Sequence, residues 1–161
     1  MKKILYTVIP VVLIILLTIL LVFIFLPDDK KITKITEIKR FSFEYSEGYA
    51  ANSYTRYKLE CQAKCIATIK PYGMPEEDIK EYEVNSDFVN KLIDLFNKYE
   101  VVSWDGFDRV AKDVLDGDSF SFFLWIQDDI KIEASGYMLW PDNYSKVREE
   151  INSLFNSINE E

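Results

Sequence analysis

The polarity pattern opens with one long apolar run, and short alternating and helical segments follow it. Residues 4–26 read ILYTVIPVVLIILLTILLVFIFL and contain no charged side chain. At about 1.5 Å per residue these residues form a helix of roughly 34 Å, which exceeds the ~30 Å hydrocarbon core of a bilayer. The run therefore predicts one transmembrane helix inside an N-terminal anchor, residues 1–26, which ties the chain to the lipid bilayer.

A cleaved signal peptide is the alternative interpretation of this run. Its apolar region usually has about 7–15 residues and ends in small side chains, whereas this run is longer and ends in bulky Phe23, Ile24, Phe25 and Leu26. We therefore expect an uncleaved, single-pass signal anchor. Basic residues just beyond the run, from Lys30 to Arg40, favour a cytoplasmic location for the rest of the chain. The Met-Lys-Lys start is instead typical of an exported chain, and we expect the remainder on the extracytoplasmic side of the cell membrane.

The remainder divides into a charged spacer, residues 27–36, and one domain, residues 37–161. Strict alternation predicts half-buried strands, and apolar residues at helical spacing predict surface helices. The expected strands cover residues 40–45, 54–60, 65–70, 120–126 and 130–134, with a shorter one at 79–84; Asn85 or Ser86 caps a helix that reaches residue 99, and a second helix starts near Pro141. Asp128 and Asp129 mark a hairpin turn.

This order of elements predicts an α+β domain preceded by the transmembrane helix. Three or four strands come first, and a helix, a hairpin and a second helix follow. Neither helical pattern is apolar all round, so each helix should lie on the surface of a sheet. We expect an antiparallel β-sheet with both helices packed on one face.

Charge and composition narrow the possible partners. The net charge is −8, and residues 71–161 hold 8 basic and 21 acidic residues, a net charge of −13. Such a surface repels nucleic acid and favours cationic partners or metal ions, although acidity can also serve solubility alone. The chain has no histidine, which excludes Ser-His-Asp, Cys-His and HExxH chemistry.

An Asp-rich segment between residues 105 and 118 is the candidate metal site. Asp113, Asp116 and Asp118 place three carboxylates within six residues, and Asp105 and Asp108 lie close by. Calcium binds clustered oxygen ligands on a loop, so a metal-dependent or carboxylate-using enzyme working through this loop is the alternative function. The Asp-Gly pair also marks a tight turn into the next strand, and the EF-hand spacing is absent.

Cys61 and Cys65 are the only cysteines. If residues 62–64 form a hairpin loop, the two cysteines lie opposite each other at a Cα separation that a disulfide can bridge. Outside the cytoplasm such a pair oxidises. The alternative is two buried free thiols, since the loop lacks the Gly or Asn that such turns favour.

A group of aromatic residues is the candidate binding site. Trp and Tyr dominate binding hot spots because they combine a large apolar area with a polar tip. The alternative is that the group closes one end of the core. Its members fall in expected loops or at a helix start: Trp104, Phe107, Tyr137, Trp140 and Tyr144.

Three sequence blocks resemble those of a group of bacterial membrane-anchored or lipoprotein-like proteins. They are WDGF (104–107), VLDGDSFSF (114–122) and ASGYMLWPDNY (134–144), in this order ahead of a C-terminal helix. The resemblance covers roughly residues 35–158 and implies an exported bacterial protein, but no activity. The absence of histidine and of any nucleophile motif instead supports our expectation of a membrane-tethered, non-enzymatic module that binds a protein, a peptide or an envelope component.

Overall fold

A computed structural model of the chain describes residues 32–48 and 54–160. The chain divides into residues 1–31 and a compact unit, Ile32–Glu161. The described residues form, in chain order, β1 (Ile38–Ser46), β2 (Thr55–Cys61), β3 (Cys65–Pro71), η1 (Glu76–Asp78), β4 (Glu81–Val84), α2 (Ser86–Lys98), η2 (Val101–Trp104), β5 (Phe107–Val110), β6 (Ser119–Ile126), η3 (Gln127–Asp129), β7 (Lys131–Tyr137), α3 (Tyr144–Asn156) and η4 (Ser157–Glu160), where η denotes a 3-10 helix.

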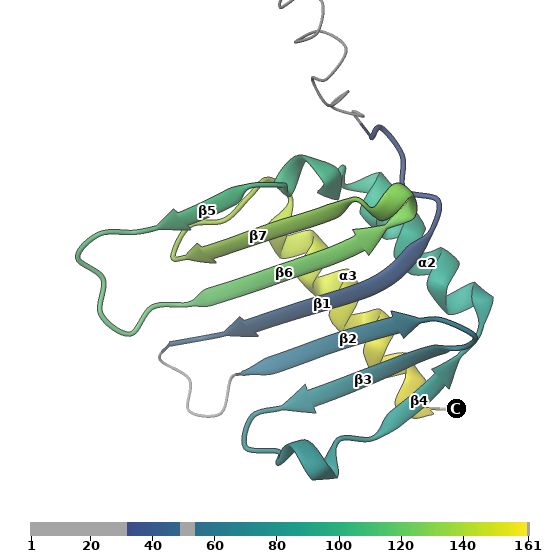
Figure 1. Cartoon of the computed structure of the whole chain (residues 1–161). Coiled ribbons are helices and arrows are strands. Elements are labelled where there is room, and N and C mark those ends of the chain that lie inside the picture. Colours follow the sequence, from purple (N-terminus) through teal and green to yellow (C-terminus); the bar gives the residue numbers. More distant parts are fainter. Residues whose placement is uncertain (1–31, 49–53, 161) are drawn as a thin grey trace, which may run out of the picture. The chain divides into compact units, whose positions relative to one another are not determined.

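The strands form one mixed sheet in the order β4-β3-β2-β1-β6-β7-β5 (Figure 1). The α+β class is thus confirmed, but the expectation of a purely antiparallel sheet is wrong at one edge, where β5 pairs with β7 in parallel. Alternation over the four residues of β5 is too short to distinguish a strand from the Asp- and Gly-rich loop around it. A parallel pairing also needs a crossover rather than a hairpin, and local turn signals do not reveal it.

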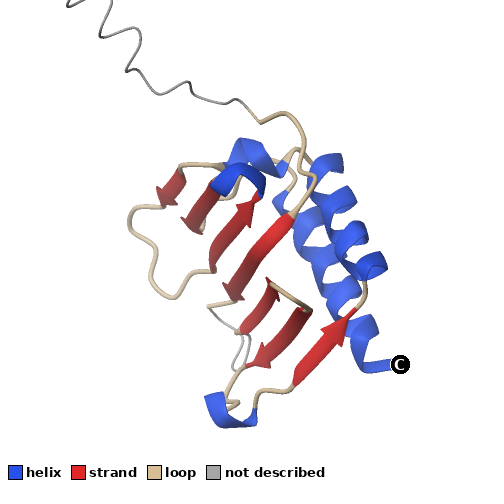
Figure 2. Cartoon of the chain, turned by 45° about the vertical axis from the view of Figure 1, so that its right-hand side comes forward, coloured by secondary structure: helices blue, strands red, loops and turns tan. Residues whose placement is uncertain are grey.

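Alternation along the strands separates a covered face of the sheet from an open one. In β6, Phe120, Phe122, Leu124 and Ile126 are buried, whereas the intervening side chains are half-buried or exposed. Figure 2 shows α2 and α3 on the same side of the sheet, as the amphipathic patterns predicted. We call the opposite side, which neither α2 nor α3 covers, the open face; across its middle it carries Arg40, Ser42, Glu44, Ser121, Phe123 and Trp125.

Aromatic side chains fix both helices to the central strands. The Phe41 ring of β1 lies 5.3 Å from that of Phe96 on α2 and 5.9 Å from that of Phe155 on α3, measured between ring centroids. It also meets Phe122 of β6 edge-on at 5.7 Å. Such pairs contribute about 0.5–1.5 kcal/mol beyond their apolar burial, so one side chain ties two strands and two helices into a single core.

The two helices begin differently from each other. The Asn85 side chain accepts a hydrogen bond from Phe88 N (3.0 Å), which confirms it as the N-cap of α2. The second helix was expected to start near Pro141 but begins at Tyr144. Asn143 precedes it with a φ of 62°, and Tyr144 N donates to Pro141 O, so Pro141 belongs to a turn that leads into the helix.

Residues 32–37 belong to the compact unit, Ile32–Glu161. Ile35 is fully buried, and its backbone N–H and C=O both bond the Asn97 side chain at 2.8 Å. The Gln127 amide also binds this segment, accepting from Thr36 N and donating to Lys34 O. These hydrogen bonds hold the segment before β1 against α2 and η3.

The predicted transmembrane helix, residues 4–26, lies outside the described residues. Among the helices formed by residues 32–48 and 54–160, none is long and apolar enough to cross a membrane.

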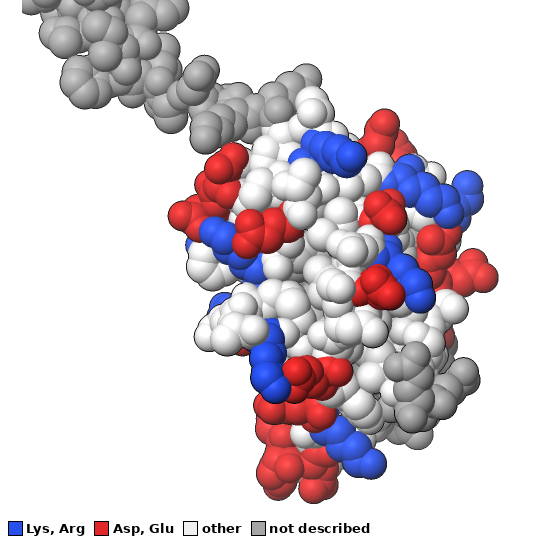
Figure 3. Space-filling model, turned by 90° about the vertical axis from the view of Figure 1, so that its right-hand side faces the viewer, with Lys and Arg blue, Asp and Glu red and all other residues white. Residues whose placement is uncertain are grey.

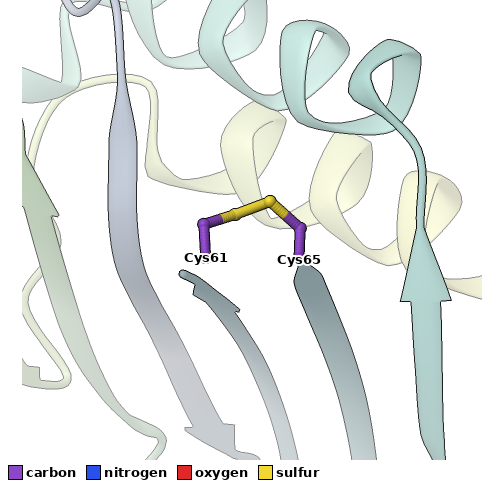
Figure 4. The surroundings of a disulfide bond; sticks show 2 residues. All are labelled: Cys61 and Cys65. Carbon is purple, nitrogen blue, oxygen red and sulfur yellow. A yellow bond between two sulfur atoms is a disulfide. The ribbon is translucent and has the colours of Figure 1, made fainter. Parts of the chain in front are cut away.

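Cys61 and Cys65 form a disulfide at the end of the β2–β3 hairpin (Figure 4). They are directly opposed in the register, with a Cα–Cα distance of 4.1 Å. Both side chains are partly buried against the edge of the core. The short loop between them is closed by a hydrogen bond from Gln62 N to Lys64 O (3.0 Å), without the Gly or Asn that a tight turn usually needs.

Candidate functional site

Exposed apolar side chains concentrate at one end of the sheet. In the described part of the chain, six large hydrophobic residues are exposed, and five of them come from two segments, one that begins with the last residue of β5 and one that follows β7. Leu115 is the most exposed, at 85%. Large exposed apolar patches on soluble domains usually mark interaction sites. We call these five residues the apolar end: Val110, Leu115, Met138, Leu139 and Trp140.

Tyr137 holds the two segments of the apolar end together. Its hydroxyl accepts a hydrogen bond from Gly117 N (2.6 Å) and donates to Val114 O (3.3 Å). Its backbone carbonyl accepts from Ala111 N at 2.9 Å. A Cβ atom on Gly117 would lie 2.4 Å from the Met138 side chain, so any larger residue there would force the Met138 side chain to move.

The predicted aromatic group is divided between the core and the surface. Trp104 is 1% exposed and Tyr144 5% exposed, and the Trp104 indole donates to Asp142 O at 3.0 Å. Burial raises the pKa of the Tyr144 hydroxyl. Trp140, in contrast, is 37% exposed and stacks on Tyr144 with ring centroids 4.6 Å apart. Trp104 and Tyr144 thus form a buried base on which Trp140 rests.

The other two members of the group lie beside this stack. The Phe107 ring is half-buried, lies 6.2 Å from the ring of Phe120, and is covered by the Arg109 guanidinium at 5.2 Å. Tyr137 lies on the open face, in register with Val110 and Ser119. The structure therefore brings Trp104, Trp140 and Tyr144 together, places Phe107 at their margin and sets Tyr137 on the other side of the sheet.

The carboxylates of the Asp-rich segment take part in separate local hydrogen bonds. Asp105 Oδ1 accepts from Glu133 N (3.1 Å), Asp108 Oδ1 accepts from Ser135 Oγ (2.7 Å), and Asp118 Oδ1 accepts from Gly48 N (3.0 Å). Asp113 and Asp116 have φ values of 60° and 56°, a conformation that Asp tolerates in turns. Within the described residues, no three acidic, cysteine or histidine side chains are grouped as metal ligands.

A groove opens on the open face beside β5. Its volume is about 460 Å³, and it lies over the pairing of β5, β6 and β7. The open-face side chains that line it supply two carboxylates, two hydroxyls and one aromatic ring, from Asp108, Glu133, Ser121, Ser135 and Phe123. None of the described residues that line it is basic. Sequence reasoning had not selected Glu133 or Phe123, because nothing in the sequence shows that β7 pairs with β5 on one side and with β6 on the other.

A second groove, of about 620 Å³, lies on the other half of the open face. It is lined by basic and acidic side chains together, and one ion pair, between Arg56 and Glu76, lies within it. Glu76 accepts from Arg56 Nη2 at 2.8 Å and also from Lys70, and these bonds lower the pKa of its carboxyl group to about 2. Because the Glu76 charge is already satisfied by these two partners, this groove has less capacity for a charged ligand than the first.

Charges of both signs also alternate elsewhere on the surface. Figure 3 views the side on which α2 and β4 lie in Figure 1, and there Lys and Arg side chains stand among Asp and Glu. One such pair joins Lys98 Nζ to Glu150 at 2.7 Å across the two helices. This side therefore offers no field of one sign, in contrast to the groove beside β5.

A search of protein-family models gave no match to this chain, and a search of curated proteins gave none either. Inference about function therefore depends on the chain's own residues.

Proposed function

We propose that this protein is a membrane-tethered, extracytoplasmic module that binds a protein partner through its apolar end and catalyses no reaction. The observation that carries the proposal is the concentration of exposed apolar side chains on two neighbouring segments. Aromatic and aliphatic anchors with a fixed base are typical of binding hot spots, and Trp140 rests on such a base, formed by Tyr144.

The charge around the apolar end indicates the kind of partner. Residues 108–118 contain four carboxylates, of Asp108, Asp113, Asp116 and Asp118, against two basic residues. A partner that presents apolar side chains flanked by lysine or arginine would match both the apolar area and the surrounding charge. The same excess of acid disfavours nucleic acid.

Two observations support the location. The uncharged run 4–26 has the length of a membrane span, and a disulfide such as Cys61–Cys65 persists in oxidising compartments but not in the cytoplasm. The absence of catalysis is supported by the chemistry available. Ser135 donates its hydroxyl proton toward Asp108, and the chain has no imidazole to act as the base of a serine nucleophile.

Site-specific photo-crosslinking in the cells that make the protein tests the binding surface. A photoreactive amino acid at position 115 or 139 of the full-length chain should give discrete, heavier protein adducts. The matched control is position 72, because Tyr72 is 57% exposed and apolar but lies at the β3 end, near the opposite edge of the sheet. Equal adducts at position 72, or no adducts at positions 115 and 139, would contradict the proposal.

A further inference from the structure

The groove beside β5 lies on a regular grid of side chains on the open face. One row runs across the strands from Glu44 through Ser121 and Ser135 to Asp108, and the neighbouring row pairs Phe123 with Glu133. From strand spacing and rise, the Cα atoms of Asp108 and Glu133 are about 8 Å apart. Both side chains are exposed and project from the same face, so their carboxylates can reach one group between them.

The surroundings of these two carboxylates favour a cation. The Ser135 hydroxyl holds one oxygen of Asp108 at 2.7 Å and leaves the other available. The Phe123 ring lies directly across the strand pair from Glu133 and is half-buried, and an aromatic face attracts a cation within about 6 Å. The basic residues nearest in sequence to the two carboxylates are Arg109 and Lys131, whose charged groups lie over the rings of Phe107 and Trp125.

We propose that this groove binds the ammonium or guanidinium group of a lysine or arginine side chain carried by the protein partner. The inference rests on the proposed function, and it specifies the partner's chemistry. Ammonium or guanidinium donors can bond Asp108 and Glu133 together, while the aliphatic stem of the same side chain lies along the Phe123 ring. A hard metal ion fits less well, because calcium takes six to eight oxygen ligands and only two carboxylates converge here.

The position of the groove relative to the apolar end agrees with a single extended partner segment. Val110 of the apolar end follows Asp108 by two residues on β5, and both belong to the open face. Two residues of a strand span about 6.6 Å. A partner segment with a basic residue and, two or more positions away, a large apolar residue can therefore occupy the groove and contact the apolar end together.

A nuclear magnetic resonance titration of the full-length protein in detergent micelles tests the inference. The probe is N-acetyl-lysine methylamide, and N-acetyl-norleucine methylamide serves as the neutral probe of the same length. The lysine probe should shift the amide signals of Phe123 and Ser135 in a saturable way, and the neutral probe should not. Absence of a saturable shift with the lysine probe, or equal shifts with both probes, would overturn the inference.

Paired carboxylate variants separate the groove from the general charge of the surface. Asp108→Asn with Glu133→Gln should weaken binding of the lysine probe by about tenfold or more, because two charge-assisted hydrogen bonds are lost. Glu81→Gln with Glu83→Gln removes the same charge from β4, at the other edge of the sheet, and should change binding less than about twofold. Equal weakening by both pairs would show that only general charge attraction is involved and would overturn the site.

The outcomes distinguish this inference from the function on which it rests. Normal photo-crosslinking at positions 115 and 139 in the Asp108→Asn, Glu133→Gln variant would leave the apolar end as the binding surface and remove the groove from it. Loss of all crosslinking at those positions in the unaltered protein, with the lysine probe still bound, would instead remove the proposed function and leave a cation site without it.

Discussion

Replacement of Trp104 by alanine should destabilise the protein far more than replacement of Trp140 by alanine. The two tryptophans belong to one aromatic stack, but Trp104 is 1% exposed and Trp140 is 37% exposed. The Trp104 ring lies 5.2 Å from the ring of Phe122 and 6.1 Å from that of Tyr144. Its indole nitrogen also bonds Asp142 O, which loses this donor in the variant.

The size of the difference follows from burial and contacts. Truncation of a buried tryptophan to alanine typically costs about 3–5 kcal/mol, whereas loss of the partly exposed Trp140 stack should cost about 1 kcal/mol. With an unfolding entropy of about 2.1 cal/mol/K per residue over roughly 130 residues, these costs lower the melting temperature by about 15 °C and about 4 °C.

Thermal unfolding of residues 32–161, followed by circular dichroism, measures both shifts. Trp140 should matter more for binding than for stability. In the photo-crosslinking assay, Trp140→Ala in the full-length chain should reduce adducts at position 139 without loss of the fold. A Trp104→Ala variant that melts within about 3 °C of the unaltered protein would refute the assignment of Trp104 to the core. A Trp140→Ala variant as unstable as Trp104→Ala would refute the division of the stack.

Three further predictions follow from individual contacts. Replacement of Cys61 and Cys65 by serine should cost about 2 kcal/mol for a closed loop of this length, measured as a lower melting temperature that dithiothreitol reproduces in the unaltered protein only. Asn97→Ala should cost about 1–3 kcal/mol of stability, because the backbone N–H and C=O of Ile35 lose their hydrogen-bond partner. Amide hydrogen exchange in the segment before β1 should then accelerate. Unchanged exchange would show that Asn97 does not hold this segment. The Glu76 carboxyl, whose pKa is lowered to about 2, contributes stability that is present above its ordinary pKa near 4.5 and lost as pH falls toward 2; Lys70→Met should move its titration, followed by nuclear magnetic resonance, back toward 4.5.

Much of the fold could be predicted because the strands and helices carry clear periods. β6 alternates over eight residues with every second side chain buried, and α2 repeats its buried residues at helical spacing with Asn85 in the capping position. These features depend on neighbouring residues only, so the sequence pattern shows them directly. The parallel edge strand is different, because β5 has four residues and its pairing with β7 depends on where the chain runs after α2.

The candidate site was harder to predict for the same reason. Sequence reasoning selected Trp140 by residue type but grouped it with Trp104, since burial depends on contacts with Phe122 and Tyr144 that are distant in sequence. Leu115 was passed over, although an apolar residue among aspartates in a loop is itself a signal of exposure. The groove required the register between strands, which sets Phe123 opposite Glu133.

The central position of β1 has a mechanical consequence. β1 is the first strand of the compact unit, and it pairs with β2 over Arg40–Tyr45 on one side and with β6 over Ile38–Ser46 on the other. A pull on the amino-terminal end in the direction of this strand would load both ladders at once, rather than separate one edge strand pair by pair. Ahead of the strand, the Asn97 and Gln127 side chains form hydrogen bonds with the backbone of Ile35 and Lys34. These bonds would therefore be the first to come under such a force. We therefore expect the unit to resist unfolding by a pull along β1.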